Sequence, residues 1–401
     1  MLRHCLAGLC LALLPLTVMP EERDPITVGL LLDLDGPYSL IAGRGSLHAA
    51  RMAIEDVDGE VLGRPVEIIH ADHGNSVERA ERIARDWLEN QQVDIIADTV
   101  GSPVALAVQE INRDHKAVLI FNAVVSKALT NEACATTSFH WMYDSYMFSR
   151  SIARLALEEA HRDWFVLYVD NAYGQDSLRE ISTAVEANGG NIIGTAGHSL
   201  GDRRMLRHMI EAEEAGADVL AIASAGDDLQ SAVKQAFDLH SVSRGDMLVT
   251  PVGATVPNIR EAGLGVTQGM VLATPFYWDQ DDTAREWSGR FQEYHGRKPS
   301  EPQAGVYSAL THYFRAVDEL GTAEGELVAR AMRDMPVSDP VVRDGFIRAD
   351  GRLVQDIRLV EMKSPTDSAH EWDVARVVGT VPGKEAFKPL SLSDCPLVSR
   401  D

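Results

Sequence analysis

Short apolar runs alternate with amphipathic helical stretches along almost the whole chain. This alternation limits the folds that the chain can adopt more than any other feature of the sequence. The first predicted strands span residues 26–34, 65–71, 94–99 and 117–121, and the helices between them span 45–57, 76–89 and 102–114. Strands that alternate with helices build parallel sheets covered by helices on both faces. The first third of the chain therefore predicts an α/β lobe.

A second series of the same kind follows a helix predicted at residues 144–160. Its strands are predicted at 164–169, 192–196, 219–223 and 247–252, with helices at 173–188, 204–215 and 227–239. The chain has 401 residues, more than the roughly 250–300 at which one core stops growing, so two lobes are expected. The remainder has helices predicted at 281–294, 302–320 and 325–335 and short strands at 357–362 and 374–380. Because it is too helical for a third sheet, we expect it to complete the two lobes.

Composition and charge exclude several classes of protein. Apolar residues make up 45% and charged residues 24% of the chain, which is typical of a soluble globular protein. With 37 basic and 60 acidic residues the net charge is -23, so nucleic acid and anionic membrane surfaces are repelled. A small anion can still bind locally, because helix N-termini offer backbone amides whatever the net charge.

The N-terminus indicates export. Residues 5–18 form an apolar run that is too short to span a bilayer but has the length of a signal-peptide core, so residues 1–20 are predicted to be a signal peptide. A buried N-terminal helix is the alternative, and a lipid anchor is less favoured. Removing this segment leaves Cys134 and Cys395. In an oxidising compartment they form either a disulfide or two unrelated buried thiols.

The sequence favours a binding protein over an enzyme. It has no H-E-x-x-H zinc motif, no P-loop and no complete dinucleotide fingerprint, so we predict no catalytic residue and no cofactor. His70, Asp72 and His73 include possible metal ligands at a strand end, and residues 279–282 are acidic. Neither group has the spacing of a metal site, so we predict no metal.

The junctions between strands and helices carry the candidate binding residues. Ligands of open α/β sheets bind beyond the carboxyl ends of the strands. Tyr38, residues 101–102, residues 122–126 and Tyr173 all follow predicted strands. Their amides and hydroxyl groups suit a carboxylate. A further set of aromatic residues stands where the chain passes between lobes and either lines a pocket or packs the hinge: Trp141, Tyr143, Phe276, Tyr277 and Trp278.

At these junctions the chain resembles the leucine/isoleucine/valine-binding type of solute-binding protein that serves ABC importers. The resemblance covers about residues 26–398 and is carried by ITVGLLLDLDGPYSLIAGRGSLHAARMAIED, VLGRPVEIIHADHGN, VLIFNAVVSKALT and DNAYGQDSLREISTAVEANGG. It implies a type 1 periplasmic binding fold, with two lobes joined by three crossovers and the ligand in the interlobe cleft. The implied boundaries are 25–141 and 274–352 for the N-terminal lobe, 142–273 and 353–380 for the C-terminal lobe, and 381–401 for a tail.

The resemblance also implies roles for individual residues. Tyr38 would cover the pocket, and Tyr173 would close over the ligand from the second lobe. Ser102 would donate its hydroxyl, and the stretch containing Ala123 and Val125 would hold a carboxylate, although valine stands where such proteins often have threonine.

Two departures bear on the ligand. Residues 224–226 lack the aromatic residue, and residues 251–254 lack the glutamate, that amino-acid binders of this type commonly have. A buried ammonium without a partner is costly, so a plain α-amino acid is disfavoured unless Asp227 or another acid substitutes. The small residues, together with Tyr277 and its neighbours, resemble relatives that bind aromatic carboxylates.

The resemblance therefore implies a periplasmic receptor for a small carboxylate-bearing solute, either an aromatic acid or an amino-acid-like compound. Its partners would be an ABC permease and its ATPase in the inner membrane, and a monomer suits this role. The alternative is an exported ligand sensor that signals through a partner protein. An enzyme built on tandem α/β domains is disfavoured by the missing nucleotide motifs.

Overall fold

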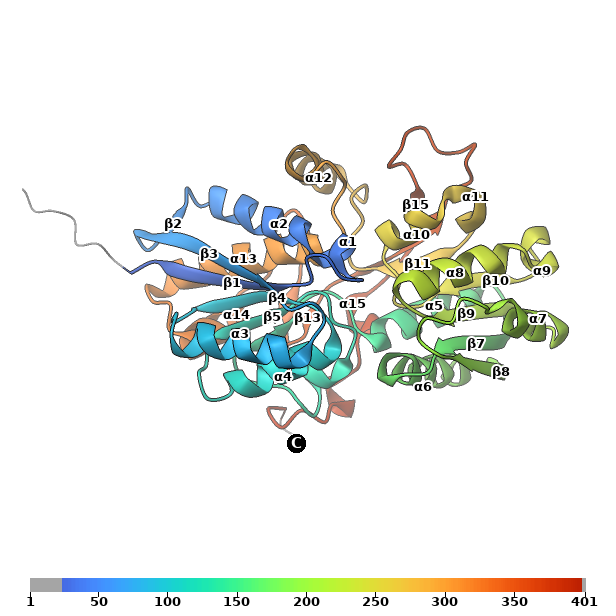
Figure 1. The fold of residues 1–401 in the computed structure, drawn as a ribbon, viewed down its shortest axis with the longest axis horizontal. Helices are drawn as coiled ribbons and strands as arrows, with labels where there is room; N and C mark the ends of the chain where they lie inside the picture. Colours follow the sequence, from blue (N-terminus) through green and yellow to red (C-terminus); the bar gives the residue numbers. More distant parts are fainter. Residues whose placement is uncertain (1–23, 399–401) are drawn as a thin grey trace, which may run out of the picture.

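Two α/β lobes lie side by side in the computed structural model, which describes residues 24–398 (Figure 1). The signal peptide predicted for residues 1–20 lies outside the described residues. No helix among residues 24–398 is both long enough and apolar enough to cross a membrane.

The first lobe is built on a six-stranded sheet with the order β2-β3-β1-β4-β5-β6. Only β2 runs antiparallel to its neighbour. The strands are β1 (Ile26–Leu32), β2 (Glu60–Val61), β3 (Arg64–Asp72), β4 (Ile95–Thr99), β5 (Val118–Phe121) and β6 (Ser138–His140). The helices of this part are α1 (Ser39–Ala42), α2 (Arg44–Glu55), α3 (Val77–Glu89), α4 (Ser102–Asn112), α12 (Asp282–His295), α13 (Glu301–Leu320) and α14 (Gly325–Asp334).

Burial explains why the central strands of this sheet are continuous apolar runs. Every residue of β4 and β5 is buried, because α3 and α4 cover one face of the sheet while α2 and α13 cover the other. Strands covered on both faces lose the alternation of apolar and polar residues. The more peripheral β3 is partly exposed and alternates.

The second lobe repeats the plan on a smaller sheet with the order β10-β9-β7-β8, all parallel. Its strands are β7 (Asp163–Val169), β8 (Asn191–His198), β9 (Val219–Ala223) and β10 (Leu248–Pro251). Its helices are α5 (Ser145–Glu158), α6 (Ala172–Ala187), α7 (Leu206–Glu214), α8 (Gly226–Phe237), α9 (His240–Arg244), α10 (Val256–Ala262) and α11 (Leu264–Thr267). The predicted strands and long helices of both lobes are confirmed to within a few residues.

The expectation that the remainder forms no third sheet was wrong. β11 (Val271–Thr274), β14 (Ile357–Met362) and β15 (Ala375–Val381) form a three-stranded antiparallel sheet. A short pair, β12 (Phe346–Ile347) with β13 (Leu353–Val354), lies between β11 and β14 in the chain. β11 has only four residues, so its strand pattern is too short to read without knowledge of its partners.

Arg352 ties together two of the chain segments that run between the lobes. Its side chain is fully buried, and its guanidinium lies 3.5 Å from the Asp144 carboxylate. It also donates to the backbone carbonyl groups of Met142 and Leu353 and lies over the Phe387 ring, 4.3 Å from the centroid. Residues 142–144 lead into the second lobe and residues 352–353 lead back to β14, so this one cation fixes both segments at the hinge.

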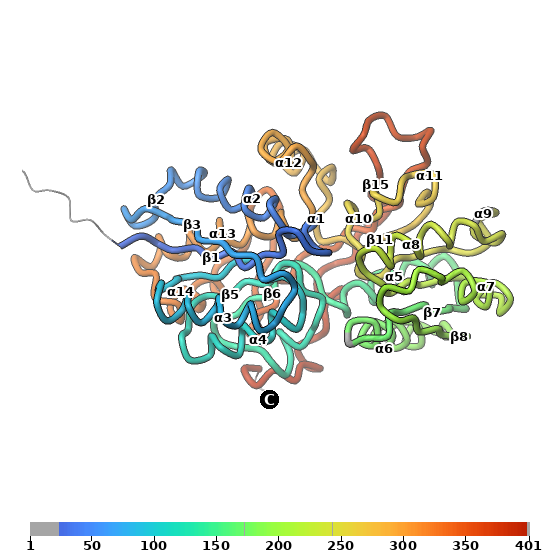
Figure 2. The backbone as a smooth tube through the Cα atoms, in the orientation of Figure 1, coloured from blue at the N-terminus to red at the C-terminus, as the bar shows by residue number. Residues whose placement is uncertain are grey.

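A disulfide fastens the C-terminal segment to the first lobe. Cys134 and Cys395 are joined, with 5.6 Å between their Cα atoms. The segment that carries Cys395 follows α15 (Gly383–Ala386) and a short helical turn at Leu390–Leu392. Lys388 adds a hydrogen bond from its Nζ to the side chain of Asn131 at 2.9 Å. The segment after β15 therefore crosses back to the first lobe (Figure 2).

Removing this disulfide should destabilise the folded chain. The two cysteines are 261 residues apart in sequence, and closing a long loop restricts the unfolded chain more than the folded one. We expect the double variant Cys134→Ser/Cys395→Ser to lose roughly 3–5 kcal/mol of unfolding free energy, measured by urea titration. Wild-type protein in reducing agent should match the variant. Equal stability of the oxidised and reduced forms would contradict this account.

Candidate ligand-binding site

The two main sheets bring side chains from the carboxyl ends of their strands together between the lobes. Tyr38 follows β1 in the first lobe, and Tyr173 follows β7 in the second. The Tyr38 hydroxyl is close enough to contribute to the raised pKa of Tyr173, whose main cause is burial. A Cβ atom placed on Gly226, at the start of α8, would lie 3.9 Å from Pro37. The lobes therefore meet along this edge.

Tyr38 is held in place by the loop before it. The buried carboxylate of Asp33 accepts hydrogen bonds from the amides of Gly36 at 3.1 Å and Tyr38 at 2.9 Å. The half-buried Tyr38 packs against an apolar cluster that includes Val100 and Ala123. Tyr38 therefore lies between the ends of β1, β4 and β5.

Ser102, Ala123 and Val125 lie next to one another at the ends of β4 and β5. Ser102 begins α4, and its Oγ accepts a hydrogen bond from the Ser126 amide at 3.2 Å. The hydroxyl hydrogen stays available to a ligand. The amides of Ala123 and Val125 are engaged by no backbone or side-chain acceptor of residues 24–398. These donors form a suitable cradle for a carboxylate.

Tyr173 is fixed against the loop after β10. Its hydroxyl donates to the carbonyl oxygen of Val252 at 2.7 Å, and burial raises its pKa. Gly174 is required beside it, because a Cβ atom there would stand 1.9 Å from the Val169 carbonyl oxygen. A Cβ atom on Gly253 would come within 2.6 Å of the Tyr173 hydroxyl. The glycine at 253, in the stretch 251–254 that lacks the glutamate common in such proteins, therefore leaves room for this ring.

An ion pair joins the lobes beside the tyrosines. Lys127, in the turn after β5, pairs with Glu180 of α6 and lies 3.7 Å from the Asp176 carboxylate on the same helix. Asp176 also accepts a hydrogen bond from Ser145 at 2.6 Å. Because Lys127 and α6 belong to different lobes, this ion pair bridges the lobes.

The structure does not bring Asp227 to these residues. Its side chain is 80% exposed and pairs with Arg203 at 2.7 Å on the surface. The expectation that Asp227 touches the ligand therefore fails, since a carboxylate in water cannot replace a buried ammonium partner.

Tyr277 lies in the core between the lobes. It is 2% exposed, and its hydroxyl donates to the carbonyl oxygen of Ala375 at 3.1 Å. Its ring lines a small cavity and presents an aromatic face to it. Its hydroxyl is already engaged by Ala375.

Two buried acids near this region were missed by the sequence analysis. Asp98, at the end of β4, is fully buried; its Oδ2 accepts a hydrogen bond from Ser46 at 2.6 Å, and its Oδ1 has no partner. Its φ of 62° lies in the left-handed region, which is costly for a residue other than glycine. Both side-chain polar atoms of the neighbouring, fully buried Asn122 also lack a partner.

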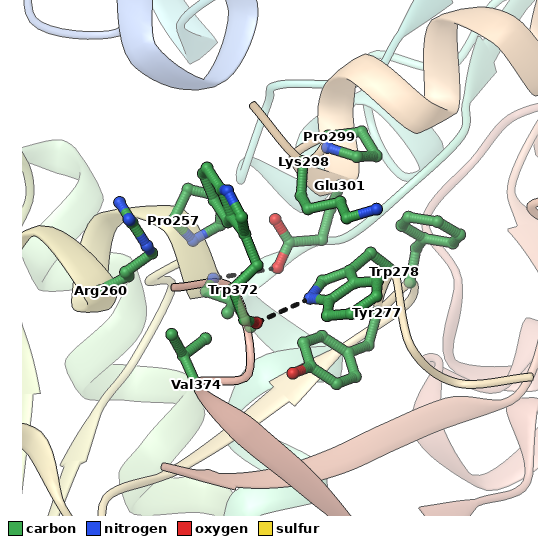
Figure 3. Close-up of a pocket in the computed structure, with 11 residues that line it drawn as sticks. Pro257, Arg260, Tyr277, Trp278, Lys298, Pro299, Glu301, Trp372 and Val374 are labelled. Carbon is green, nitrogen blue, oxygen red and sulfur yellow. Dashed lines mark hydrogen bonds between the residues drawn. The ribbon is translucent and has the colours of Figure 1, made fainter. Parts of the chain in front are cut away.

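Glu301 is the second acid, at the start of α13. Its Oε1 accepts hydrogen bonds from the Val256 amide at 3.2 Å and the Thr274 hydroxyl at 2.9 Å, and its Oε2 has no partner. Figure 3 shows this carboxylate between Trp372 and Trp278. The cavity has a free volume of about 10 Å³, which is the space of one water molecule.

Tyr143 lies among these groups. Burial raises its pKa most, and the charges of Glu301 and Asp98 raise it further, followed by Tyr38 and Tyr173. The four groups that act on Tyr143 come from both lobes, so they surround one region. The sequence gives one signal for these two acids, which is their position in apolar surroundings. Asp98 lies inside an apolar stretch, and Glu301 lies directly before one.

Two of the residues considered as metal ligands, Asp72 and His73, accept hydrogen bonds from backbone amides. Asp72 accepts from the amides of Leu34 and Gly74, and the His73 ring accepts from the Asn75 amide at 3.0 Å. Among residues 24–398 no group of three or more acid, histidine or cysteine side chains is placed to hold a metal ion.

A serine-hydrolase pattern that the sequence analysis passed over has no supporting geometry. Residues 197–201 read G-x-S-x-G, but no helix follows Ser199 until α7 begins at Leu206. The His198 Nε2 lies 2.7 Å from the Ser224 hydroxyl, and its Nδ1 lies 3.0 Å from the Ser199 carbonyl oxygen. A nucleophilic serine needs a sharp turn from strand to helix and a base at its hydroxyl; Ser199 lacks this turn, and the adjacent His198 ring contacts the Ser224 hydroxyl and the Ser199 backbone carbonyl instead.

Comparison with known proteins identifies the family. Residues 25–369 match the family described as Periplasmic binding protein. The chain belongs to this family. It is 32% identical to the branched-chain amino-acid ABC transporter periplasmic ligand-binding protein of Burkholderia xenovorans LB400, whose crystal structure superposes with a TM-score of 0.89 over 93% of this chain and 100% of that one.

Two further relatives differ in the solutes that they are described as binding. The leucine-, isoleucine-, valine-, threonine- and alanine-binding protein of Pseudomonas aeruginosa is 22% identical over 80% of this chain and 86% of its own length. A Rhodopseudomonas palustris solute-binding protein in complex with benzoate is 16% identical, with a TM-score of 0.80 over 93% of this chain and 99% of its own. The family is one of periplasmic solute-binding proteins of ABC transporters, not of enzymes.

The buried Glu301 carboxyl should make stability depend on pH. Burial raises its pKa from 4.5 to about 7, so between these values the folded chain holds a proton that the unfolded chain has lost. Wild-type stability therefore falls as pH rises through this window. We expect the unfolding free energy of Glu301→Gln, relative to wild type, to rise between pH 4 and pH 7.5 by up to about 3 kcal/mol. Parallel curves for the two proteins in urea titrations would contradict this.

Proposed function

We propose that this protein is the exported solute receptor of an ABC importer. It binds a small carboxylate-bearing solute, an aromatic acid or an amino-acid-like compound, between its lobes and presents it to a permease driven by an ATPase in the inner membrane. A monomer suits a receptor whose lobes must open and close against that permease.

The observation that carries this proposal is the meeting of Tyr38 and Tyr173 across the lobes, beside free donors of the first lobe. In the proposed mechanism the solute carboxylate docks first on the hydroxyl of Ser102 and on the amides of Ala123 and Val125. Contacts with Tyr173 then favour the closed arrangement, because only a ligand that touches both lobes shifts the equilibrium towards it.

The test is a thermal-shift screen of the exported chain after refolding has removed any carried ligand. The panel contains amino acids, aromatic carboxylates, aliphatic amides and short organic acids. A solute at about a hundred times its dissociation constant adds roughly 2.7 kcal/mol of stability, which raises the melting temperature measurably. We expect at least one carboxylate to do so. No shift across the panel would contradict the proposal.

The variant Tyr173→Ala tests whether the solute binds between the lobes. It removes a contact made only on closure, so affinity should fall by well over tenfold while circular dichroism stays unchanged. Tyr294→Ala is the matched control, since Tyr294 is 47% exposed on α12 and its hydroxyl donates to Glu55 in the first lobe. Equal affinities of the two variants, measured by calorimetry, would refute the assignment of Tyr173.

A further inference from the structure

A second cavity lies between α5 of the second lobe and the C-terminal segment. Its volume is about 630 Å³, within the roughly 300–1,000 Å³ that is typical of small-molecule sites. It shares no lining residue with the proposed solute site at Tyr38, Ser102 and Tyr173. Neither the sequence analysis nor the proposed function gives this cavity a role.

Helical spacing sets basic side chains along one wall of this cavity. Tyr146, Arg150 and Arg154 follow one another at four-residue intervals on α5, so they share one face of that helix. The opposite wall includes Lys384 of α15, a helix that packs against α5. Arg162, which directly precedes β7, adds a fourth basic side chain.

One of these basic side chains joins the two walls. Arg154 pairs with Glu158 on α5 at 3.0 Å and with Glu385 on α15. Glu158 and Glu385 are the acids that line the cavity, and Arg154 engages both. The cavity is therefore formed before any ligand enters, and its acids already have a cationic partner.

The other three basic side chains have no acidic partner. No carboxylate of residues 24–398 lies within 4.0 Å of a side-chain nitrogen of Arg150, Arg162 or Lys384. Arg162 makes one long hydrogen bond, at 3.5 Å, to the carbonyl oxygen of Asn188. The chain as a whole has 60 acidic and only 37 basic residues, so three cations in one cavity without an acid run against its general charge. Like charges repel one another, and an anion between them relieves the repulsion.

We propose that this cavity binds a small polyanion with two or more phosphate or carboxylate groups, at a site separate from that of the transported solute. Guanidinium groups hold both kinds of anion through two parallel hydrogen bonds. Arg150 and Lys384 contact the polyanion from opposite walls, and Arg162 contacts it from the start of β7. Because these three charges are spread around the cavity, a ligand with several anionic groups fits it better than a single small ion.

The first experiment titrates pyrophosphate and citrate into the folded chain by calorimetry, at low ionic strength and again with added salt. We expect at least one of these polyanions to bind, with an affinity that falls as salt screens the attraction. Pyrophosphate and citrate also tell a phosphate-bearing ligand from a carboxylate-bearing one. No binding of either at low ionic strength would overturn the proposal.

The double variant Arg150→Gln/Lys384→Gln assigns the binding to this cavity. We expect it to lose at least tenfold in affinity for the polyanion that binds. The control Arg82→Gln/Lys234→Gln removes the same two charges at exposed positions on α3 and α8 that also have no acid within 4.0 Å. It should bind within twofold of wild type. Equal losses in the two double variants would show an effect of net charge alone and would refute the site.

A conservative variant separates the geometry of Arg150 from its charge. Arg150→Lys keeps the charge but not the planar fork, so its loss of affinity should be smaller than that of Arg150→Gln. Unchanged melting curves of the ligand-free variants verify their folds. Wild-type affinity in Arg150→Gln would exclude a contact between Arg150 and the polyanion.

The variant Tyr173→Ala tests whether the two sites are separate. It should bind the polyanion as wild type does, because Tyr173 does not line this cavity. This control matters because the short organic acids of the solute panel carry the same groups as citrate. If Tyr173→Ala loses polyanion binding, or the polyanion displaces a solute found by thermal shift, the separate site is refuted while the proposed function stands.

Discussion

The buried guanidinium of Arg352 is the interaction on which the arrangement of the two lobes depends. Burial lowers its pKa to about 10, and the nearby Asp144 charge opposes that shift. Asp144 also caps α5 by accepting from the Met147 amide at 2.8 Å. Removing one partner of a buried ion pair costs about 3–5 kcal/mol. Loss of either Arg352 or Asp144 would therefore destabilise the hinge. It fixes the start of the second lobe to the segment that returns from the first.

That hinge sets which edges of the sheets face one another. In both lobes the central strands are parallel and their carboxyl ends carry the loops with Tyr38, Ser102 and Tyr173. The residues proposed to bind the solute therefore lie in short loops on rigid strands, and we propose that the cleft changes shape by rotation of whole lobes. The disulfide between Cys134 and Cys395 anchors the C-terminal segment to the first lobe.

Much of this architecture could be predicted from the sequence because it depends on local patterns. The apolar runs at β1, β5 and β9 and the helix after Tyr173 have unambiguous periodicity, and segment order carried the family resemblance. The third sheet could not be predicted, since its first strand, β11, has four residues and its partner, β14, lies far along the chain, with Val271 paired to Glu361.

The chemistry of the cleft was predicted only in part, for a physical reason. Glycine and tyrosine positions after strands follow from the topology, but burial of a carboxylate follows from tertiary contacts. Glu301 reads as an ordinary acid in the first turn of a helix, and only the packing of α10 and Trp372 encloses it. Asp227 occupies the same kind of position on α8 and is exposed. Sequence alone could not tell these two acids apart.

Small-angle X-ray scattering with and without solute tests the central claim, that the lobes close around a ligand, most directly. Wild-type protein saturated with a solute found by thermal shift should have a smaller radius of gyration than ligand-free protein. Lys127→Ala, which removes the ion pair to α6, should shift the ligand-free protein further towards the open form. The account predicts contraction in both proteins on binding. An unchanged radius of gyration on saturation would contradict it.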